Sequence, residues 1–372
     1  MSAPSVTDTA LSIGNRIGRY FSLVSMLPAL LLVLWAYILV ASRAWSAPPS
    51  LMQTAHRLSH WSASAAGWTL IATLIVALFL HPLQFVTTQF LEGYWGTSAH
   101  ARAAMTRRIL HHRRRRARLD ALEQSHQSSW QDAADELLLV RFEDDQRQDS
   151  HASVEAHPDS WDEPTRQLRR TELLDSSAGD GLVADVVTED AARRSWARYP
   201  EGGRVMPTRL GNALRRFEDA AGSQYGLDAV STAPHFSLVA PDRHVQYLRD
   251  SRQQMDTTIR LCTVSLLATA LAVGFLLRDG LWLLAALLPY SLAYVAYRGA
   301  VASADEYGTA VTTVVDLDRF LLYQELHVNV PRDTAEERKS NAGLVRLLGG
   351  DYGANVRYRR DQEGAGKRRL AP

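Results

Sequence analysis

A basic segment directly behind an apolar one constrains this chain more than any other feature. Residues 90–120 read FLEGYWGTSAHARAAMTRRILHHRRRRARLD. They leave a long apolar segment, pass Tyr94 and Trp95, and enter a stretch in which residues 100–118 hold arginines and no acid. Placing one arginine at the bilayer centre costs about 2.5–3.5 kcal/mol on insertion scales. The pattern therefore predicts a transmembrane helix that ends at the cytoplasmic face, with the arginines kept inside.

Four apolar segments are long enough to cross a hydrocarbon core, which takes about 20 residues. They cover residues 20–41, 68–87, 258–277 and 281–298. A cleaved signal peptide is the alternative for the first, because small residues follow it. Its apolar part is longer than a signal peptide needs, and a second segment follows closely. We therefore predict an all-α integral membrane protein, with two transmembrane helical hairpins flanking a mainly helical cytoplasmic insert.

Arginine placement predicts the topology. A net charge of +1 averages very apolar blocks with very charged ones, and arginines are more numerous on one side of the apolar segments than on the other, which holds Arg43, Arg57 and Arg278. The positive-inside rule then puts both termini and the insert in the cytoplasm of a cell-membrane protein, and residues 42–66 outside. The one cysteine, Cys262, excludes an internal disulfide and a cysteine-based zinc site.

The predicted layout has six parts. They are an N-terminal tail (1–19), a first hairpin (20–95), the insert (96–256), a second hairpin (257–302), a cytoplasmic C-terminal helix (303–345) and a disordered tail (346–372). The insert divides by charge into a basic part (100–118), an acidic part (120–163) and a folded part (165–256). The acidic part is compatible with a clasp onto the basic part or with a solvated linker.

Three short segments of the insert have predicted extended structure. Glu136–Phe142 is apolar enough for a strand or a buried turn, and Gly181–Val187 for a short strand. Pro234–Pro241 is expected to be extended, because a residue before proline avoids the helical region.

The arginines of the basic part are the candidate membrane-surface contacts. Near an anionic leaflet each basic residue adds about 1 kcal/mol of attraction. Nucleic-acid binding is a weaker interpretation, because neither a groove-reading fold nor interleaved aromatic residues accompany the run. Docking of an acidic partner or segment stays open. The candidates are Arg107, Arg108, Arg113, Arg114, Arg115 and Arg116.

Polar groups at membrane depth are the next candidates. His81 and Gln84 flank Pro82 in the second apolar segment. An ionisable group there suggests a functional pathway, whereas Pro82 also leaves backbone groups that a neighbouring side chain can satisfy. Glu92, at the inner interface, is predicted to pair with Arg260 or Arg298 and so join the two hairpins.

The folded part of the insert holds the last candidate set. PTRLGNALRRFED starts at residue 207 as an amphipathic helix, and YGLD turns the chain after it. Their polar side chains predict either a buried network that locks the insert or a partner-binding surface. The candidates are Arg209, Asn212, Arg216, Glu218, Asp219, Tyr225 and Asp228.

Several strings together carry a resemblance. They are GRYFSLVSMLP at 18–28, LEGYWG at 91–96, PTRLGNALRRFED at 207–219, YGLDAV at 225–230, and YG with DLDRFLLYQEL within 307–326. The combination resembles a group of uncharacterised multi-pass integral membrane proteins from high-GC Gram-positive-type bacteria. The resemblance implies this membrane layout and carries no activity or catalytic residue.

The chain contains no Gly-rich phosphate loop, GxSxG elbow, HExxH motif or paired cysteine ligands. We therefore expect no enzyme, cofactor or metal site, and a membrane anchor or signalling adaptor that acts through the cytoplasmic insert. Its expected partners are the bilayer with its anionic head groups, a cytoplasmic protein, and a second copy of the chain. The alternative is an oligomeric small channel or transporter subunit. In that case His81, Gln84 and the tyrosine face of the fourth segment would line the pore.

Overall fold

The computed structural model describes residues 26–44, 49–50, 52, 54–56, 62–148 and 157–359. The predicted tail 1–19, the start of the first span and the end of the C-terminal tail lie outside these residues. The chain forms two compact units, which we describe separately. The membrane unit comprises Met1–Arg102 and Thr208–Pro372, and the inserted unit comprises Ala103–Pro207.

The membrane unit contains three helices that are long and apolar enough to cross a membrane. They are α3 (Ala63–Glu92), α9 (Asp242–Leu276) and the segment Gly280–Glu325, made of η5 (Gly280–Ala286) and α10 (Leu287–Glu325). The last three predicted spans lie inside these helices. A shorter apolar helix, Met26–Ala41, contains the described part of the first predicted span.

Helix α3 begins and ends on local signals in the sequence. The side chain of Ser62 accepts a hydrogen bond from the backbone N–H of Ala65 at 3.2 Å, which is an N-cap. Gly93 ends the helix in the left-handed region, at φ 112°, and its N–H donates to the carbonyls of Gln89 and Phe90. Glycine adopts this conformation without the steric cost that a Cβ adds. The helix therefore stops directly before Tyr94.

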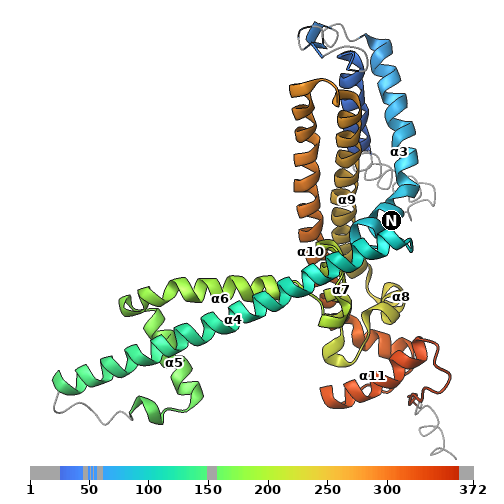
Figure 1. Cartoon of the computed structure of the whole chain (residues 1–372). Coiled ribbons are helices and arrows are strands. Elements are labelled where there is room, and N and C mark those ends of the chain that lie inside the picture. The colour runs from blue at the N-terminus through green and yellow to red at the C-terminus, as the bar shows by residue number, and fades with distance from the viewer. Residues whose placement is uncertain are drawn as a thin grey trace, which may run out of the picture. The chain divides into compact units, whose positions relative to one another are not determined.

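Helices α9 and α10 form an antiparallel pair that runs side by side (Figure 1). The pair packs through small residues, which let two backbones approach closely. The helix Met26–Ala41 joins it where the indole N–H of Trp35 donates to the carbonyl of Ala268 at 3.1 Å. The buried alanines are Ala268 and Ala272 on α9 and Ala293, Ala296, Ala300, Ala304 and Ala310 on α10.

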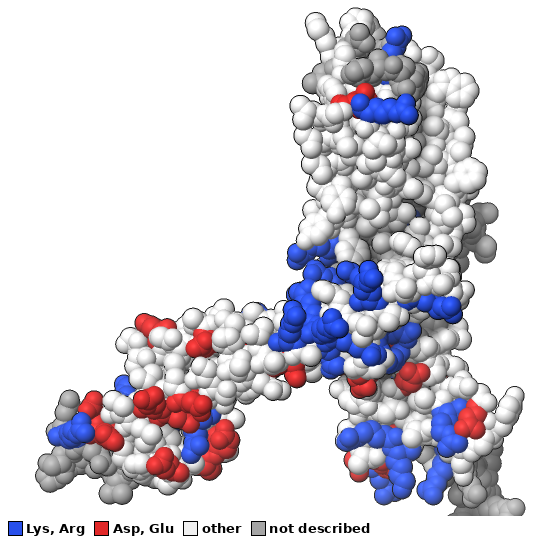
Figure 2. Space-filling view, in the orientation of Figure 1, with Lys and Arg blue, Asp and Glu red and all other residues white. Residues whose placement is uncertain are grey.

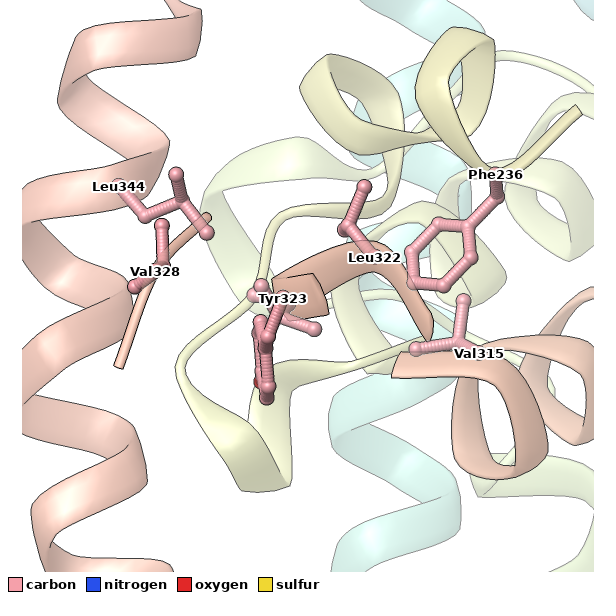
Figure 3. Close-up of a cluster of buried hydrophobic side chains, with 7 residues drawn as sticks. Phe236, Val315, Leu322, Tyr323, Val328 and Leu344 are labelled. Atoms are coloured by element: carbon pink, nitrogen blue, oxygen red, sulfur yellow. The ribbon is translucent and has the colours of Figure 1, made fainter. Parts of the chain in front are cut away.

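Helix α10 continues past its apolar part into a second core. There it packs with α7 (Arg209–Ala220), α8 (Ala229–Val239) and α11 (Thr334–Leu348). A Cβ built on Gly308 of α10 would lie 1.8 Å from the ring of Phe217, so only glycine permits this crossing. Figure 3 shows six members of the core as labelled sticks. The buried core residues are Leu227, Phe236, Val315, Leu322, Tyr323, Val328 and Leu344.

The inserted unit is built on one long helix, α4 (Ala99–Gln148), whose first four residues belong to the membrane unit. Ala134, Leu173 and Leu182 form its small core, with Trp130 and Leu138 at the edge. The remaining elements are η1 (Pro158–Ser160), α5 (Glu163–Leu174), η2 (Ser177–Leu182), α6 (Val183–Trp196) and η3 (Gly202–Arg204).

The predicted extended segments are wrong. Glu136–Phe142 lies within α4, and Gly181–Val187 passes from η2 into α6. A short apolar run fits a strand or a helix equally well, and the helical spacing of Trp130, Ala134 and Leu138 against α5 and η2 decides for helix. The described residues contain one isolated antiparallel bridge, Val328–Tyr358, and no strand.

Pro234 also lies inside a helix instead of an extended segment. Asp228 caps α8 by accepting the N–H of Ser231 at 2.9 Å, and buried Phe236 holds the helix on the core. Proline six residues into a short, capped and packed helix removes only one internal hydrogen bond. Packing of Phe236 offsets that loss.

The acidic part and the C-terminal tail also differ from their predictions. Residues 120–148 continue the helix of the basic part, so these two parts cannot fold back on each other; residues 149–156 lie outside the described residues. The predicted tail from 346 begins inside α11, and Val356 packs against the second core. The N–H of Asn329 donates to the carbonyl of Arg357 at 3.2 Å, which holds residues before 360 in place.

Candidate functional site

One face of α4 gathers four exposed arginines of the inserted unit. Its residues recur at intervals of three and four, so they lie along one side of the helix. They line a shallow groove of about 920 Å³, and we call them the arginine face. The arginine face consists of Arg107, Leu110, His111, Arg114, Arg115 and Arg118.

The arginine face has no internal electrostatic partner among the residues that the structure describes. Its side chains are exposed, including Leu110 at 44%. None of its four arginines forms an ion pair with a described residue, whereas Arg193 and Arg194 of α6 both contact Asp190. Figure 2 shows basic side chains gathered along the first half of α4 and acidic side chains along its second half. Within the described residues, therefore, no ion pair offsets the charge of these four arginines.

The opposite side of the same helix is packed. His112 is 2% exposed, and its Nδ1 lies 3.1 Å from the hydroxyl of Tyr199. The guanidinium of Arg116 lies over the indole of Trp196, 5.1 Å from the ring centre. Arg116 was predicted as a membrane-surface contact, but its cation–π contact makes it part of the packing of the inserted unit. Arg108 is exposed, and exposed Arg113 lines a separate groove with Arg116 and Trp196.

Polar and charged side chains of the second half of α4 bind partners within the inserted unit. The indole N–H of Trp130 donates to Glu189 Oε2 at 2.7 Å. Arg170 binds Asp135 through two hydrogen bonds, Nε to Oδ1 at 2.8 Å and Nη2 to Oδ2 at 2.6 Å. Hydrogen bonding to Asp135 raises the pKa of the Arg170 guanidinium, against the opposing effect of burial. These contacts fix α5 and α6 on α4.

The candidate set around α7 is distributed over several contacts. Asn212 is buried and donates to the carbonyl of Thr208 at 2.7 Å. Arg216 donates to Asp305 of α10 at 2.9 Å. The hydroxyl of Tyr297 accepts the backbone N–H of Arg209 at 3.2 Å.

The other candidates of this set make contacts within α7 and in the elements that follow it. Glu218 accepts from Arg215 at 2.7 Å, and Asp228 caps α8. Asp219 lies on the same helix α7. The carbonyl of Tyr225 accepts the side-chain N–H of Asn341 at 2.8 Å. These contacts attach α7, η4 (Ser223–Tyr225) and α8 to α10 and α11.

A buried network that the sequence did not reveal lies in the second core. Glu337 accepts from Arg319 and from the hydroxyl of Tyr323, both at 2.9 Å. Asn341 donates to the same hydroxyl at 2.6 Å. Burial, the largest cause, raises the pKa of Tyr323, so the phenol stays neutral. The only signal of this network in the sequence was a polar residue on the apolar side of each of the two helices that form it, α10 and α11.

Of the intramembrane candidates, Gln84 makes the closer contact. Its Oε1 accepts from Nε of Arg260 at 2.8 Å and also from Nη2 of that residue, which ties α3 to α9. His81 lies one turn earlier on α3 and lines the same groove. Glu92 was predicted to pair with Arg260 or Arg298. Arg260 donates to Gln84, and the arginines that act electrostatically on Glu92 are Arg215 and Arg252. Pairing of Glu92 with Arg298 stays a prediction.

Comparisons with protein-family models, curated proteins and solved structures gave no match. Within the described part of the chain, no group of three or more His, Cys, Asp or Glu side chains is arranged to hold a metal ion.

Proposed function

We propose that this chain is a non-enzymatic membrane adaptor. The apolar helices anchor it, the arginine face of α4 binds anionic lipid head groups at the inner surface, and the inserted unit presents a surface to a cytoplasmic protein. The observation that carries the proposal is that the four arginines of the arginine face form no ion pair with a described residue, whereas Arg170, Arg193 and Arg194 of the same unit do.

The proposed topology has four spans with both termini in the cytoplasm. The helix Met26–Ala41 supplies the described part of the first span, and α3, α9 and the segment Gly280–Glu325 supply the others. The turn between α9 and η5 holds a single basic residue, Arg278, whereas Arg298 lies at the opposite end of the fourth predicted span and α9 carries four arginines toward its opposite end, Arg243, Arg249, Arg252 and Arg260. This asymmetry supports the inside location of the arginine face.

Head-group attraction at this face is large enough to matter. At about 1 kcal/mol for each basic residue near an anionic surface, four arginines contribute about 4 kcal/mol. That is about a thousandfold in an equilibrium constant. The attraction falls off over about 8 Å at physiological salt, so it acts only when α4 lies close to the leaflet.

Exposed apolar side chains on the inserted unit support the adaptor role. Val183 and Val187 lie one turn apart on α6, with exposures of 45% and 57%. Leu168 of α5 is 59% exposed. Apolar side chains in a charged surface mark a site for protein contact when they form one patch. A cytoplasmic protein that binds here is the expected partner.

The lipid contact can be tested with a fluorophore on α4. We would remove the native thiol (Cys262→Ala) and label either Leu110→Cys on the arginine face or Ser129→Cys, an exposed position in the second half of α4. Full-length protein in anionic vesicles with head-group quenchers should show strong quenching at position 110, reduced in 1 M salt. Position 129 should be insensitive to lipid charge. Equal quenching at both positions in anionic vesicles would rule out the proposed contact.

The protein contact needs its own test. We would isolate the full-length protein from its membranes in mild detergent and compare Val187→Asp with Thr188→Asp, a change at an exposed residue on another side of α6. A stoichiometric cytoplasmic protein that is lost only from Val187→Asp supports the adaptor. A homogeneous protein without such a partner contradicts it. The channel alternative has less support, because Gln84 accepts from Arg260 in a contact between two helices.

A further inference from the structure

One side of α10 that does not pack on α9 carries hydroxyl groups within the predicted fourth span. Its residues recur at intervals of three and four, so they lie along one side of the helix. All of them are exposed, whereas Ala293 and Ala296 are buried where α10 packs on α9. We call this set the tyrosine stripe, and it consists of Leu287, Tyr290, Ser291 and Tyr294.

Tyr290 lies near the middle of the predicted span. It comes nine positions after Leu281 and eight positions before Arg298, the two ends of that span. Eight residues of α-helix cover about 12 Å of a hydrocarbon core that is about 30 Å thick. A tyrosine side chain is too short to reach either membrane surface from there. The Tyr290 side chain, which is 54% exposed, therefore faces either acyl chains or another protein segment.

The hydroxyl of Tyr290 needs a hydrogen-bond partner. It forms no hydrogen bond with a residue that the structure describes. The hydroxyls of Thr263 and Thr269, in the neighbouring span, donate to carbonyls of their own helix α9 at 2.9 and 2.7 Å. Arg298 acts on the hydroxyl of Tyr294, one turn closer to the inner surface. Acyl chains offer no hydrogen-bond partner, so a polar group from another protein segment would stabilise Tyr290.

We propose that the tyrosine stripe packs on the same stripe of a second copy of this chain, with the two Tyr290 hydroxyls hydrogen-bonded to each other. A hydroxyl is both a donor and an acceptor, so two identical hydroxyls can satisfy one another. Copies that insert with the same topology hold Tyr290 at the same depth. A two-fold axis along the membrane normal then brings identical residues together.

Ser291 adds a second acceptor to the proposed contact. Its hydroxyl donates to the carbonyl of Leu288 at 2.8 Å, which leaves its lone pairs for a hydroxyl of the other copy. One Tyr290 can thus donate to its counterpart, and the counterpart can donate to Ser291. The inference rests on the proposed topology and is independent of the arginine face, which belongs to the inserted unit.

Energy transfer between labelled copies of the full-length protein measures their association in vesicles. Ser129→Cys in the Cys262→Ala background would carry the donor or the acceptor, and the lipid-to-protein ratio would be varied. Tyr290→Phe removes the hydroxyl and keeps the ring. Tyr247→Phe removes an exposed phenol outside the predicted spans and is the matched control. One hydrogen bond between membrane helices corresponds to roughly threefold to tenfold in the dimer dissociation constant.

The expected result is saturable energy transfer in the labelled background and in Tyr247→Phe. Tyr290→Phe should raise the dimer dissociation constant by roughly threefold to tenfold. Absence of saturable energy transfer in the background would overturn the proposal, and so would a dissociation constant that Tyr290→Phe leaves unchanged. Quenching at position 110 reports the lipid contact of the arginine face separately, so failure of one proposal is distinguishable from failure of the other.

Oxidative crosslinking in membranes locates the contact on α10. A single cysteine would replace Leu287 on the tyrosine stripe or Leu292 on another side of the helix, again in the Cys262→Ala background, with copper phenanthroline as the oxidant. Covalent dimers of Leu287→Cys and none of Leu292→Cys support the proposal. Failure of Leu287→Cys to form dimers contradicts it, and so do crosslinks of Leu287→Cys to a different membrane protein, because that protein would then cover the stripe.

Discussion

The two halves of α4 are both helical and carry opposite charge. They differ in whether their charged side chains have partners among the described residues of the inserted unit. The second half is acidic, and Trp130 and Asp135 there bind Glu189 and Arg170 of the same unit. The first half is basic, and its arginine face forms no ion pair with a described residue. The second half is therefore fixed by contacts within the inserted unit. The arginine face of the first half has no such ion pair and carries the proposed lipid contact.

The difference shows which charges have structural roles. Arg170 is 7% exposed and bidentate with Asp135, so removing it leaves a partly buried carboxylate without its cation. Arginines of the arginine face are exposed, and salt screens exposed charges. Mutations in the second half should thus change stability, whereas mutations in the first half should change membrane association. Arg116 is an exception in the first half, because it packs on Trp196.

The largest expected effect is charge reversal of the arginine face. Changing Arg107, Arg114, Arg115 and Arg118 to Glu together should remove about 4 kcal/mol of head-group attraction. Quenching of a fluorophore at position 110, in the Cys262→Ala background, should fall to its level in neutral vesicles. Hydrogen exchange of residues 163–196 should be unchanged. Faster exchange there would show that the arginine face also stabilises the inserted unit, and it would contradict the proposed difference between the two halves of α4.

Next in size is the loss of the ion pair in the second half. Arg170→Met should lower the free energy of local opening of α5 by about 3 kcal/mol, because Asp135 loses both hydrogen bonds. Hydrogen exchange of α5 in the full-length protein measures it. Its neighbour Arg169, which forms an ion pair with exposed Glu172 and lies over the ring of Trp161, is the control. Arg169→Met should change the opening free energy by less than about 1 kcal/mol, and equal effects would contradict the assignment.

A smaller effect should follow from Trp130→Phe. This change removes the N–H that donates to Glu189, and one lost hydrogen bond to a charged group costs about 1.5–3 kcal/mol. Glu189→Gln keeps an acceptor oxygen and should cost less. Exchange rates in α6 distinguish the two variants. If both variants behave like wild type, the contact between α4 and α6 does not depend on this hydrogen bond.

The smallest effect concerns acid stability. Hydrogen bonding from Arg193 lowers the pKa of Asp190 below its ordinary value of 3.8. A lowered carboxyl pKa stabilises the folded state above pH 3.8, and this contribution disappears as the pH falls through the lowered value. Thermal melting should show Asp190→Asn slightly less stable than wild type at pH 7 and no different near pH 2. If the stability difference between Asp190→Asn and wild type grew as the pH fell, its pH dependence would have the opposite sign, and this prediction would be contradicted.

The sequence located the apolar helices well and the short elements poorly. Segments of about 20 apolar residues can satisfy their backbone in a bilayer only as helices, so their position follows from composition. Glu136–Phe142 is too short for its periodicity to separate strand from helix, and Pro234 follows a local preference that packing of Phe236 overrides. The sequence also showed the arginine run, whereas only the structure separated its exposed face from its packed side, and the role of Arg116 depended on where Trp196 lies.

The sequence by itself determined that this chain has long apolar helices, that an arginine run follows one of them, and that no cysteine chemistry joins its parts. These properties depend on composition and local spacing. Only the tertiary structure decided that Arg260 meets Gln84, that Glu337 and Asn341 share the hydroxyl of Tyr323, and that α3 leaves a groove beside α9. Contacts between distant residues depend on how helices pack, and helix packing is set by many weak interactions that no single segment encodes.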